Sequence, residues 1–459
     1  MLGVQLAELT AAPDTGVTEA LAVIDGFDAA LVDGFGRIGD DAADALAGLG
    51  AAVAGSPLAE AVAEAVAAVG AGSIEPEKLG ALAAGRAALL GAVHDALLVR
   101  FDRAVGRERT AHAETATPAA PGGVIAGCRA WLQELAINGW RGVDHDLVSA
   151  ADRTIEALWA APELRRLAVL LDGFAAELRA CAPIATLDRI PARRWADLWS
   201  QALLLTWQGA QDIDAETVSG RLLVVGVDVH EHGTAVQAQV HAVLETGTEP
   251  ARLVRVSIGA AKVDTIVGPA VWQVLGEHPR LLQALAERRT VTVADMTLTA
   301  AGDLLWVDAH AELGDPADPF TTARIQLPKA IAAAVAPLDR HPVHLGEPVL
   351  VENYRVEDGA LVIDGHRLAV ELDRLPRSGP LTVDLVTKST ACLGLVRWDA
   401  GQWRLRPLAI EYVFRKAATS AHTGDWAQGP TDPKIAKALA KSGDAVVVLR
   451  ERAGRLLRK

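Results

Sequence analysis

The segments PELRRLAVLLDGFAAELRACAP, residues 162–183, and PARRWADLWSQALLLTW, residues 191–207, decide the fold of this chain. Helices are expected to begin at Pro162 and Pro191, because the fixed φ and missing donor of proline suit a first helical turn. In the first segment large apolar residues recur at steps of three and four, which predicts one buried stripe ending before Pro183. With the residues from 127 onward, these helices predict a hydrophobic hub. It holds six of the eleven tryptophans: Trp131, Trp140, Trp159, Trp195, Trp199 and Trp207.

Length and composition are typical of a globular protein with more than one domain. The chain has 459 residues, of which 51% are hydrophobic and 22% charged, so it can bury a sizeable core. The formal net charge of −14 is unevenly spread. Residues 1–104 carry fifteen acidic and five basic side chains, whereas residues 430–459 carry eight basic and three acidic ones. The overall sign disfavours nucleic-acid binding, and the polarity indicates that the two ends have different partners or contact each other.

The cysteines indicate a reducing compartment. Cys128, Cys181 and Cys392 are sparse, odd in number and without CxxC spacing, which argues against a disulfide scaffold and a zinc ribbon. The N-terminus lacks a basic region followed by an apolar run, so no signal peptide is predicted. No uninterrupted apolar stretch is long enough to predict a membrane span. We therefore expect a cytoplasmic protein without membrane contact.

Residues 1–106 predict an alanine-rich helical bundle. Residues 107–123 have no periodicity and are rich in Thr, Ala, Pro and Gly, so they are interpreted as a linker that proteases should cut first. Residues 124–215 form the tryptophan-rich helical block. The expected helices of the bundle cover about 17–33, 41–54, 57–70 and 76–104.

From about residue 216 the hydrophobic period changes to two, which predicts a mainly antiparallel β domain over 216–430. Tight hairpin signals join adjacent strands without regular crossover helices. Helical insertions are expected at about 268–288 and 328–336, and residues 431–459 form a basic tail that opens with a lysine-rich helix. The expected strands are an alternating run from Arg221 and residues 234–244, 251–258, 290–298, 303–311, 322–327, 348–356, 360–371, 380–387, 391–398 and 402–412.

The segment DGFGRIG, residues 33–39, matches the dinucleotide-binding pattern GxGxxG through Gly34, Gly36 and Gly39. That motif requires a strand before it and a helix after it. The residues before it are helix-like, so the preferred interpretation is a turn that ends a helix.

Three histidines in VDVHEHGTAVQAQVHA, His230, His232 and His241, suggest a metal site. If His232 and Gly233 form a two-residue turn, His230 and His241 lie about 20 Å apart along the sheet, at ~3.3 Å per residue. The preferred interpretation is therefore a set of polar residues on a wet hairpin face. The same interpretation applies to His341 and His344, which lie in a proline-bounded loop.

Two acidic motifs could each contribute to a catalytic pair. Asp144, His145 and Asp146 precede an apolar periodic run, and a carboxylate at this place is expected to cap a helix. Asp308 and His310 are expected on one face of a strand, where they could form a catalytic dyad, but no serine or cysteine elbow accompanies them. The chain has no P-loop, GxSxG, HExxH or paired CxxC motif, which disfavours an enzyme.

Arginines and tryptophans alternate around residue 400. Exposed aromatics beside arginine can stack nucleic-acid bases, but the pattern equally describes a hairpin with one buried face, which is the preferred interpretation. The residues are Arg397, Trp398, Trp403, Arg404 and Arg406.

The segments GCRAWLQEL at 127–135, WADLWSQALLLTW at 195–207 and ACLGLVRWDAGQWRLRPLAI at 391–410 resemble an uncharacterised high-GC bacterial family. Genes of that family lie beside those for a MoxR-like AAA ATPase, a von Willebrand A-type protein and a SWIM zinc-finger protein. This chain has neither the Cys/His pairs of a SWIM finger nor the phosphate loop of an ATPase. The resemblance therefore implies the accessory member of such a set, and it assigns no functional residue.

These observations predict an α+β protein, with an N-terminal all-helical domain followed by a helical block packed on a mainly antiparallel sheet. The leading hypothesis is a non-catalytic adaptor or scaffold without a cofactor. Its partner would be an ATPase-type system containing a MoxR-like AAA ATPase or a von Willebrand A-type protein. The alternatives are a hydrolase or metal-dependent enzyme that uses strand-borne Asp and His residues, and a nucleic-acid-binding accessory protein. The candidate interaction residues lie on one helix face of the tail: Lys434, Lys437 and Lys441.

Overall fold

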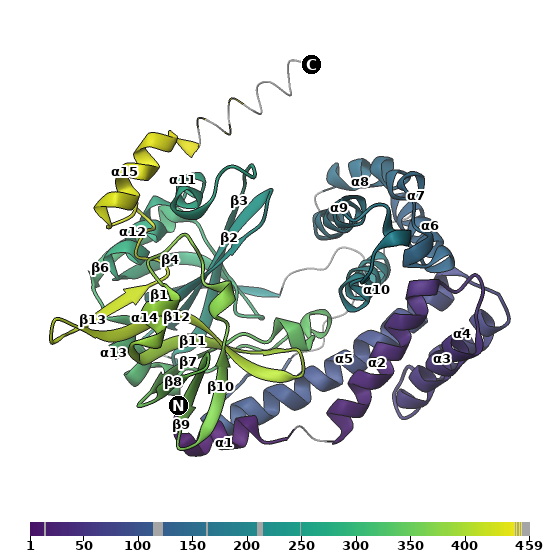
Figure 1. Ribbon diagram of the computed structural model, residues 1–459, viewed down its shortest axis with the longest axis horizontal. Helices are drawn as coiled ribbons and strands as arrows, with labels where there is room; N and C mark the ends of the chain where they lie inside the picture. Colours follow the sequence, from purple (N-terminus) through teal and green to yellow (C-terminus); the bar gives the residue numbers. More distant parts are fainter. Residues whose placement is uncertain are drawn as a thin grey trace.

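The computed structural model describes residues 1–12, 15–112, 123–161, 164–208, 214–247 and 249–445, together with residues 447, 449 and 451. Helices dominate the N-terminal half and antiparallel sheets the C-terminal half, so the predicted α+β class is confirmed (Figure 1). Several predicted features lie outside the described residues: the helix start at Pro162, most of the predicted linker (113–122), and the end of the basic tail (452–459).

The N-terminal helices agree with the apolar periodicity of the sequence. The longest, α5, begins at Pro76 and ends at Val105. Gly106 follows it with a φ of 69°, the left-handed conformation that glycine adopts at helix ends. A short helix that was not predicted, α1, packs against α5 and against strand β10 (His366–Val370). The bounds are α1 Gly3–Thr10, α2 Thr15–Asp33, α3 Asp40–Ala52, α4 Ala59–Gly70 and α5 Pro76–Val105.

The turn between α2 and α3 contains the three glycines of the GxGxxG match. It follows a helix rather than a strand, so the interpretation as a helix-ending turn is confirmed. Gly34 has a φ of 82°, and a Cβ on it would collide with the backbone of Gly139. The backbone of this turn also donates hydrogen bonds to the end of α6 (Gly123–Asn138), from Phe35 N to the carbonyl of Ala136 and from Gly36 N to that of Ile137. Glycine is required here because two chain segments touch through their backbones.

The tryptophan-rich block shares one hydrophobic core with α2–α5. Trp140, Trp195 and Trp199 are fully buried, and Trp140 packs edge-to-face on Trp195 and Phe174. The described residues of this core all come from helical segments and their connections. The block therefore packs on the N-terminal helices, whereas the sequence predicts that it packs on the sheet. Its elements are α6 Gly123–Asn138, η1 Trp140–Gly142, α7 His145–Ser149, α8 Asp152–Trp159, α9 Arg165–Ala180, η3 Ile184–Thr186 and α10 Ala192–Gln208.

A buried ion-pair network crosses this helical core. Arg86 on α5 is 1% exposed and donates to Asp28 on α2 and to Asp197 on α10, each at 2.6 Å. Asp197 also lies 3.1 Å from Nε2 of His341, in the loop before the second sheet. The network therefore joins three helices to each other and to the β half.

The first sheet is antiparallel, in the order β3-β2-β1-β4-β5, with β6 also paired to β4. Helices α11 and α12 cover one of its faces and share a core with β1–β4. The bounds are β1 Ala215–Glu231, β2 Ala235–Glu245, β3 Arg252–Ala261, η4 Gly268–Ala270, α11 Val271–Val274, α12 Pro279–Glu287, β4 Arg289–Thr299, β5 Leu304–Leu305, η5 Asp308–His310 and β6 Ala311–Pro316.

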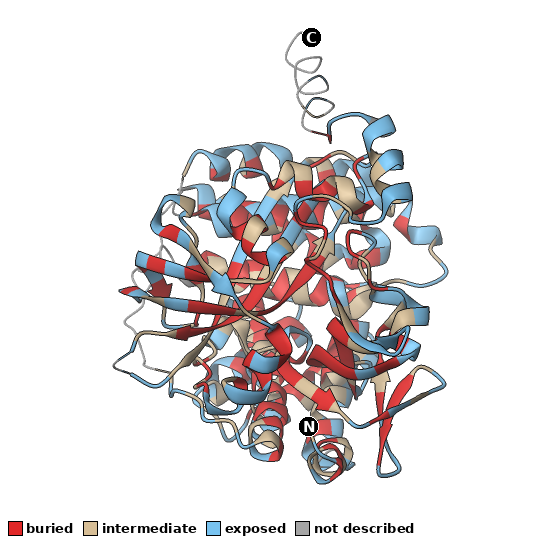
Figure 2. Ribbon diagram, turned by 90° about the vertical axis from the view of Figure 1, so that its left-hand side faces the viewer, coloured by how far each residue is buried: buried red, intermediate tan, exposed pale blue. Residues whose placement is uncertain are grey.

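The second sheet has the order β7-β11-β12-β10-β9-β8, with β13 also paired to β12, and its one parallel pair among the described residues is β10–β12. Figure 2, which views the molecule from the side of the sheets, shows buried residues along the central strands. The bounds are α13 Pro319–Ile325, η6 Leu327–Lys329, η7 Pro337–Asp339, η8 Pro342–His344, β7 Glu347–Glu352, β8 Arg355–Glu357, β9 Ala360–Ile363, β10 His366–Val370, η9 Leu372–Arg374, α14 Val383–Thr387, β11 Ser389–Asp399, β12 Gln402–Phe414, β13 Ala417–His422 and α15 Pro433–Ser442.

The structure differs from the predicted strands at several places. The predicted strands at 322–327 and 380–387 are helices α13 and α14, whose first turns are capped by Asp318 and Thr382. The predicted strand at 360–371 is a hairpin, because Asp364 and the glycine after it both adopt positive φ. Strand β13 was not predicted at all.

The predicted helix at 328–336 is wrong as well, and it bears on the predicted linker. Beyond η6, the chain is extended: Ile331 pairs with Arg252 of β3, and Ala332 pairs with Arg109. The first residues of the predicted linker are thereby held against the first sheet, with Thr110 N donating to the carbonyl of Ala332 at 3.0 Å.

Among the described residues, α5 alone is long and apolar enough to cross a membrane by length and composition. Of its most apolar stretch 56% is buried inside the protein, as in the core helix of a soluble protein.

Replacing Trp199 by alanine should lower the free energy of unfolding by about 3–5 kcal/mol, because it removes a fully buried aromatic ring. It also removes the hydrogen bond from Nε1 to the carbonyl of Leu132, 2.9 Å long. Urea unfolding measures the change. Trp159→Ala is the matched control, since Trp159 is 44% exposed. Equal losses of stability in the two variants would contradict the burial of Trp199 in the helical core.

Candidate functional site

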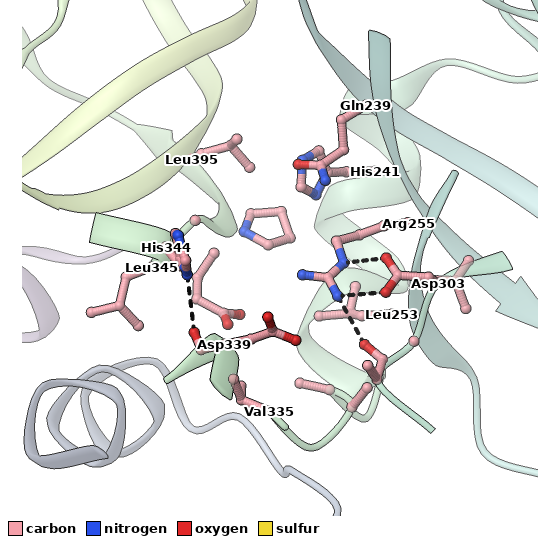
Figure 3. Close-up of a pocket in the computed structure, with 18 of the residues that line it drawn as sticks. Gln239, His241, Leu253, Arg255, Asp303, Val335, Asp339, His344, Leu345 and Leu395 are labelled. Carbon is pink, nitrogen blue, oxygen red and sulfur yellow. Dashed lines mark hydrogen bonds and ion pairs between the residues drawn. The ribbon is translucent and has the colours of Figure 1, made fainter. Parts of the chain in front are cut away.

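A cavity of about 430 Å³ lies where both sheets meet α5 (Figure 3). Its walls come from β1, β2 and β3 of the first sheet and from β7 and β11 of the second. The loop that carries η7 and η8 closes one side, and His94 of α5 also lines the space. Three parts of the fold that are far apart in sequence therefore build one site.

A β-bulge directs side chains of β1 into this cavity. Regular pairing with β2 runs to Val224 and resumes at Gly226, so Val225 is an extra residue. A bulge reverses the alternation of side chains along a strand. Asp228 and His230 beyond it consequently project toward the cavity.

Gly226 lets the two sheets touch beside the cavity. A Cβ at this position would lie 2.9 Å from Cβ of Leu408 on β12, which is closer than side-chain carbons pack. The absence of a side chain at 226 therefore allows β1 and β12 to pack directly against each other.

His241 is buried, faces the cavity and has an unsatisfied nitrogen. It lies opposite Gly226 on β1 and opposite Arg255 on β3. His241 is only 3% exposed, and its Nε2 has no hydrogen-bond partner among the described residues. Burial, reinforced by the nearby Arg255 guanidinium, lowers the pKa of His241 to about 4, so the ring is neutral at physiological pH.

Arg255 presents part of its guanidinium to the cavity. Its Nε lies 3.1 Å from Asp303, and one terminal nitrogen donates to the carbonyl of Ala301 at 3.0 Å. Figure 3 shows the other terminal nitrogen pointing into the open space.

Every carboxylate that lines the cavity is ion-paired, whereas one arginine is not. Arg397 on β11 forms no ion pair among the described residues, and its one hydrogen bond there is to the carbonyl of Val343 at 3.4 Å. The paired carboxylates are Asp228 with Arg406 (2.7 Å), Asp303 with Arg255 (3.1 Å), Asp339 with Arg166 (2.7 Å), and Glu347 with Arg109 and Arg107 (2.9 and 3.0 Å).

Asp228 and His230 form a pair at one end of the cavity. Nε2 of His230 lies 3.0 Å from the Asp228 carboxylate, which is 3% exposed. Burial opposes ionisation of Asp228, but the hydrogen bond from His230 and the charge of Arg406 outweigh it and lower the pKa of this carboxyl. Asp228 is therefore a charged group that orients His230.

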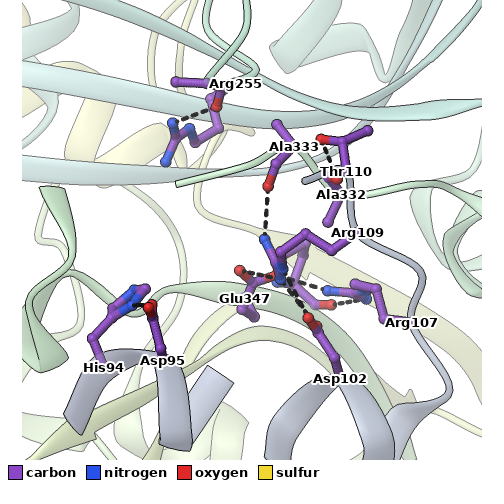
Figure 4. A network of polar contacts seen from close by, with 12 residues as sticks. His94, Asp95, Asp102, Arg107, Arg109, Thr110, Arg255, Ala332, Ala333 and Glu347 are labelled. Atoms are coloured by element: carbon purple, nitrogen blue, oxygen red, sulfur yellow. Dashed lines mark hydrogen bonds and ion pairs between the residues drawn. The ribbon is translucent and has the colours of Figure 1, made fainter. Parts of the chain in front are cut away.

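Figure 4 shows the ion-pair network behind the cavity. Glu347 accepts from Arg109 and Arg107, and Arg109 also donates to Asp102 of α5 at 2.8 Å and to the carbonyl of Ala333 at 3.0 Å. Burial opposes ionisation of Glu347, but the two arginines outweigh it and lower its pKa. The network ties α5, the second sheet and the chain that pairs with β3 into one unit.

The interpretation of the histidines as a wet hairpin face is wrong for His241. The two-residue turn lies at Gly233 and Thr234, because His232 N donates to the carbonyl of Ala235. This register places His241 opposite Gly226, four residues from His230, so the two lie about 13 Å apart along the strand at ~3.3 Å per residue. Both line the same cavity, whereas His232 is exposed and does not. In the proline-bounded loop, His344 lines the cavity and His341 contacts Asp197.

The other motifs have structural roles. Asp144 accepts from Leu147 N at the start of α7, which confirms the predicted helix cap. Asp308 lies in a 3₁₀ turn and accepts from the backbone N of Arg280, at the start of α12. The expectation that Asp308 and His310 share a strand face is therefore wrong: the chain turns there, between β5 and β6.

The arginine–tryptophan hairpin has one buried face, as preferred from the sequence. Trp398 and Trp403 are each 6% exposed and pack edge-to-face, so neither is available to stack a base. In the tail, the three candidate interaction residues on α15 are all exposed: Lys434, Lys437 and Lys441.

The described lining lacks several side-chain types that serve as nucleophiles. Among the described residues that form it there is no serine, threonine, cysteine, tyrosine or lysine, so no side-chain hydroxyl, thiol or amine faces the space. The described part of the chain also contains no group of three or more His, Cys, Asp or Glu residues arranged to hold a metal ion. The described lining is polar, and two of its histidines contact carboxylates: His230 with Asp228 at 3.0 Å and His94 with Asp95 at 2.9 Å.

Replacing Glu347 by glutamine should lower the free energy of unfolding by roughly 3 kcal/mol, because it leaves the largely buried Arg107 and Arg109 short of a counter-charge. Chemical denaturation measures the loss. Glu357→Gln is the control: Glu357 pairs with arginines on the exposed edge of the same sheet and should cost less than about 1 kcal/mol. A similar cost for both would show that the network does not hold the halves together.

Lowering the pH from 7 to about 4 should destabilise the protein, partly through His241. The unfolded chain binds a proton below pH ~6.5, whereas folded His241 binds one only below about 4. Its contribution is complete above pH ~6.5 and falls by about 3 kcal/mol as the pH drops to 4. His241→Gln should flatten the pH profile of unfolding, and His232→Gln, on the exposed end of the hairpin, should not; identical profiles for all three proteins would contradict this.

Comparison with known proteins identifies no relative. No family model, no curated protein and no solved structure matches this chain. The function is therefore inferred from the site and the surface of the molecule itself.

Proposed function

We propose that this protein is a non-catalytic adaptor or scaffold that works with an ATPase-type protein partner in the bacterial cytoplasm. The observation that carries the proposal is the surface of α15. Lys434, Lys437 and Lys441 are exposed on one helix face and form no ion pair among the described residues. A cationic face is conspicuous on a protein with a net charge of −14, and it suits an acidic surface on a partner.

The opposite face of α15 anchors it to the protein. Ile435 packs against the core of the first sheet, and Asp432 caps the helix by accepting from the backbone nitrogens of Lys434 and Ile435. Beyond the helix, Ala445 N donates to the side chain of Gln273 at 2.9 Å. The lysines are therefore presented by a fixed platform, which lowers the entropy cost of docking.

The cavity gives further support to a binding rather than a catalytic role. Its described lining has no nucleophilic hydroxyl, thiol or amine, and its carboxylates are held in ion pairs. The choice of partner rests on the resemblance to the high-GC bacterial family, which implies a MoxR-like AAA ATPase or a von Willebrand A-type protein.

Replacing Lys434, Lys437 and Lys441 by glutamate should abolish recovery of the partner in affinity purification from the native cell. Wild-type recovery should fall steeply with salt, because exposed charges are screened over about 8 Å at physiological ionic strength. The matched control carries the same charge change at three other exposed lysines, Lys329, Lys388 and Lys416.

Partner recovery that is indifferent to the α15 changes and to salt would reject this face as the docking site. Retention of nucleic acid by wild-type protein, lost in the α15 variant alone, would instead favour the nucleic-acid-binding alternative.

A second candidate function rests on the Asp228–His230 pair. A buried carboxylate that orients a histidine beside a cavity is the arrangement of a general base, so a hydrolase that activates water is the catalytic alternative. Chromogenic ester and phosphate substrates test it. Turnover that is lost in His230→Gln and retained in His232→Gln would favour the enzyme; absence of turnover in the purified wild type would favour the adaptor.

A further inference from the structure

The charges around the cavity leave a positive surplus. Each lining carboxylate is matched by an arginine, as described above, and Arg109 and Arg255 are themselves in those pairs. Arg397 remains without a counter-charge among the described residues. An unpaired guanidinium beside a partly enclosed space raises the local concentration of anions.

The surplus extends along the second sheet. Arg397 on β11 lies directly opposite Arg404 on β12, and Arg404 also forms no ion pair among the described residues. Its Nε is buried without a hydrogen-bond partner. Like charges directly opposite in a sheet are destabilising, so this pairing works against the fold unless an anion offsets it.

The first sheet contributes donors from the other wall. His241 and Arg255 are directly opposite each other on β2 and β3. His241 keeps an unpartnered Nε2 in a nearly fully buried ring, and Arg255 directs one terminal nitrogen into the space (Figure 3). A buried polar atom without a partner costs free energy, which a ligand in the cavity would recover.

We propose that the cavity binds a small organic anion through Arg397, Arg255 and His241. The volume of about 430 Å³ suits a small organic molecule. Apolar side chains share the lining and would contact the uncharged part of the ligand: Leu253, Val335, Leu345 and Leu395. The recognised group is a carboxylate or a phosphate, since a guanidinium binds either through paired N–H donors.

Calorimetric titration with three probes tests the proposal: inorganic phosphate, phenyl phosphate and benzoate. At least one should bind and raise the melting temperature, and added salt should weaken it. Phenyl phosphate should bind more tightly than inorganic phosphate, because the apolar wall contacts its ring. Preference for phenyl phosphate or for benzoate then identifies the anionic group. If none of the three binds at millimolar concentration, the proposal is wrong.

Arg397→Gln distinguishes a ligand-binding residue from a structural one. The variant should bind the probe about tenfold to a hundredfold less tightly, the effect of one charge-assisted hydrogen bond. Without a probe its melting temperature should be unchanged or higher, because the like-charge pair with Arg404 is gone. Arg415→Gln, at the exposed β12–β13 turn, is the control with the same charge change.

Wild-type affinity in Arg397→Gln would overturn the assignment, and so would equal weakening in Arg415→Gln. Should Arg397→Gln prove unstable, His241→Gln provides a second arm. It should weaken probe binding as well, and the ring-nitrogen NMR signals of His241 in the wild type should shift during the titration. Signals that stay constant while a probe binds would place the anion elsewhere.

Discussion

The two halves of this protein depend on the ion-pair network around Glu347. This carboxylate begins the second sheet and accepts from Arg109 and Arg107, which directly follow α5, the longest helix. Arg109 also forms an ion pair with Asp102 of α5 and donates a hydrogen bond to the carbonyl of Ala333. Charges removed from water are tolerated only when they are matched in this way, so the geometry of the junction is narrowly defined.

The same junction creates the cavity. Backbone pairing holds Ile331 to Arg252 of β3 and Ala332 to Arg109, so the chain that leaves α5 becomes part of the wall of the first sheet. The sheets meet where Gly226 lies against Leu408, and the bulge before Gly226 turns Asp228 and His230 inward. The charged residues that line the resulting space mostly form ion pairs that hold neighbouring elements together. Arg397 is the one without an ion pair among the described residues.

Local patterns predicted much of the fold. The helices of the N-terminal half and most long strands agree with periodicity, because amphipathic patterns record which face of an element is buried. Errors arose where a short signal competed with such a pattern. Asp318 and Thr382 cap helices in segments that alternate like strands, and the fixed path of residues 107–112 depends on distant partners rather than on local composition.

The sequence by itself determined most of the helices and long strands, the α+β class and the burial of four of the six hub tryptophans, since these follow from side-chain size and period within short windows. Trp159 and Trp207 are exposed at 44% and 37%. The contact between the tryptophan-rich block and the N-terminal helices, and the composition of the cavity, were decided only by the tertiary structure. His241 and Arg255 meet through the register of β2 and β3, and the extra residue at Val225 of β1 turns Asp228 and His230 toward the same space. Arg397 joins them from a strand more than one hundred residues later. Such groupings leave no periodic trace, because they arise from packing between elements and not from the chain within any one of them.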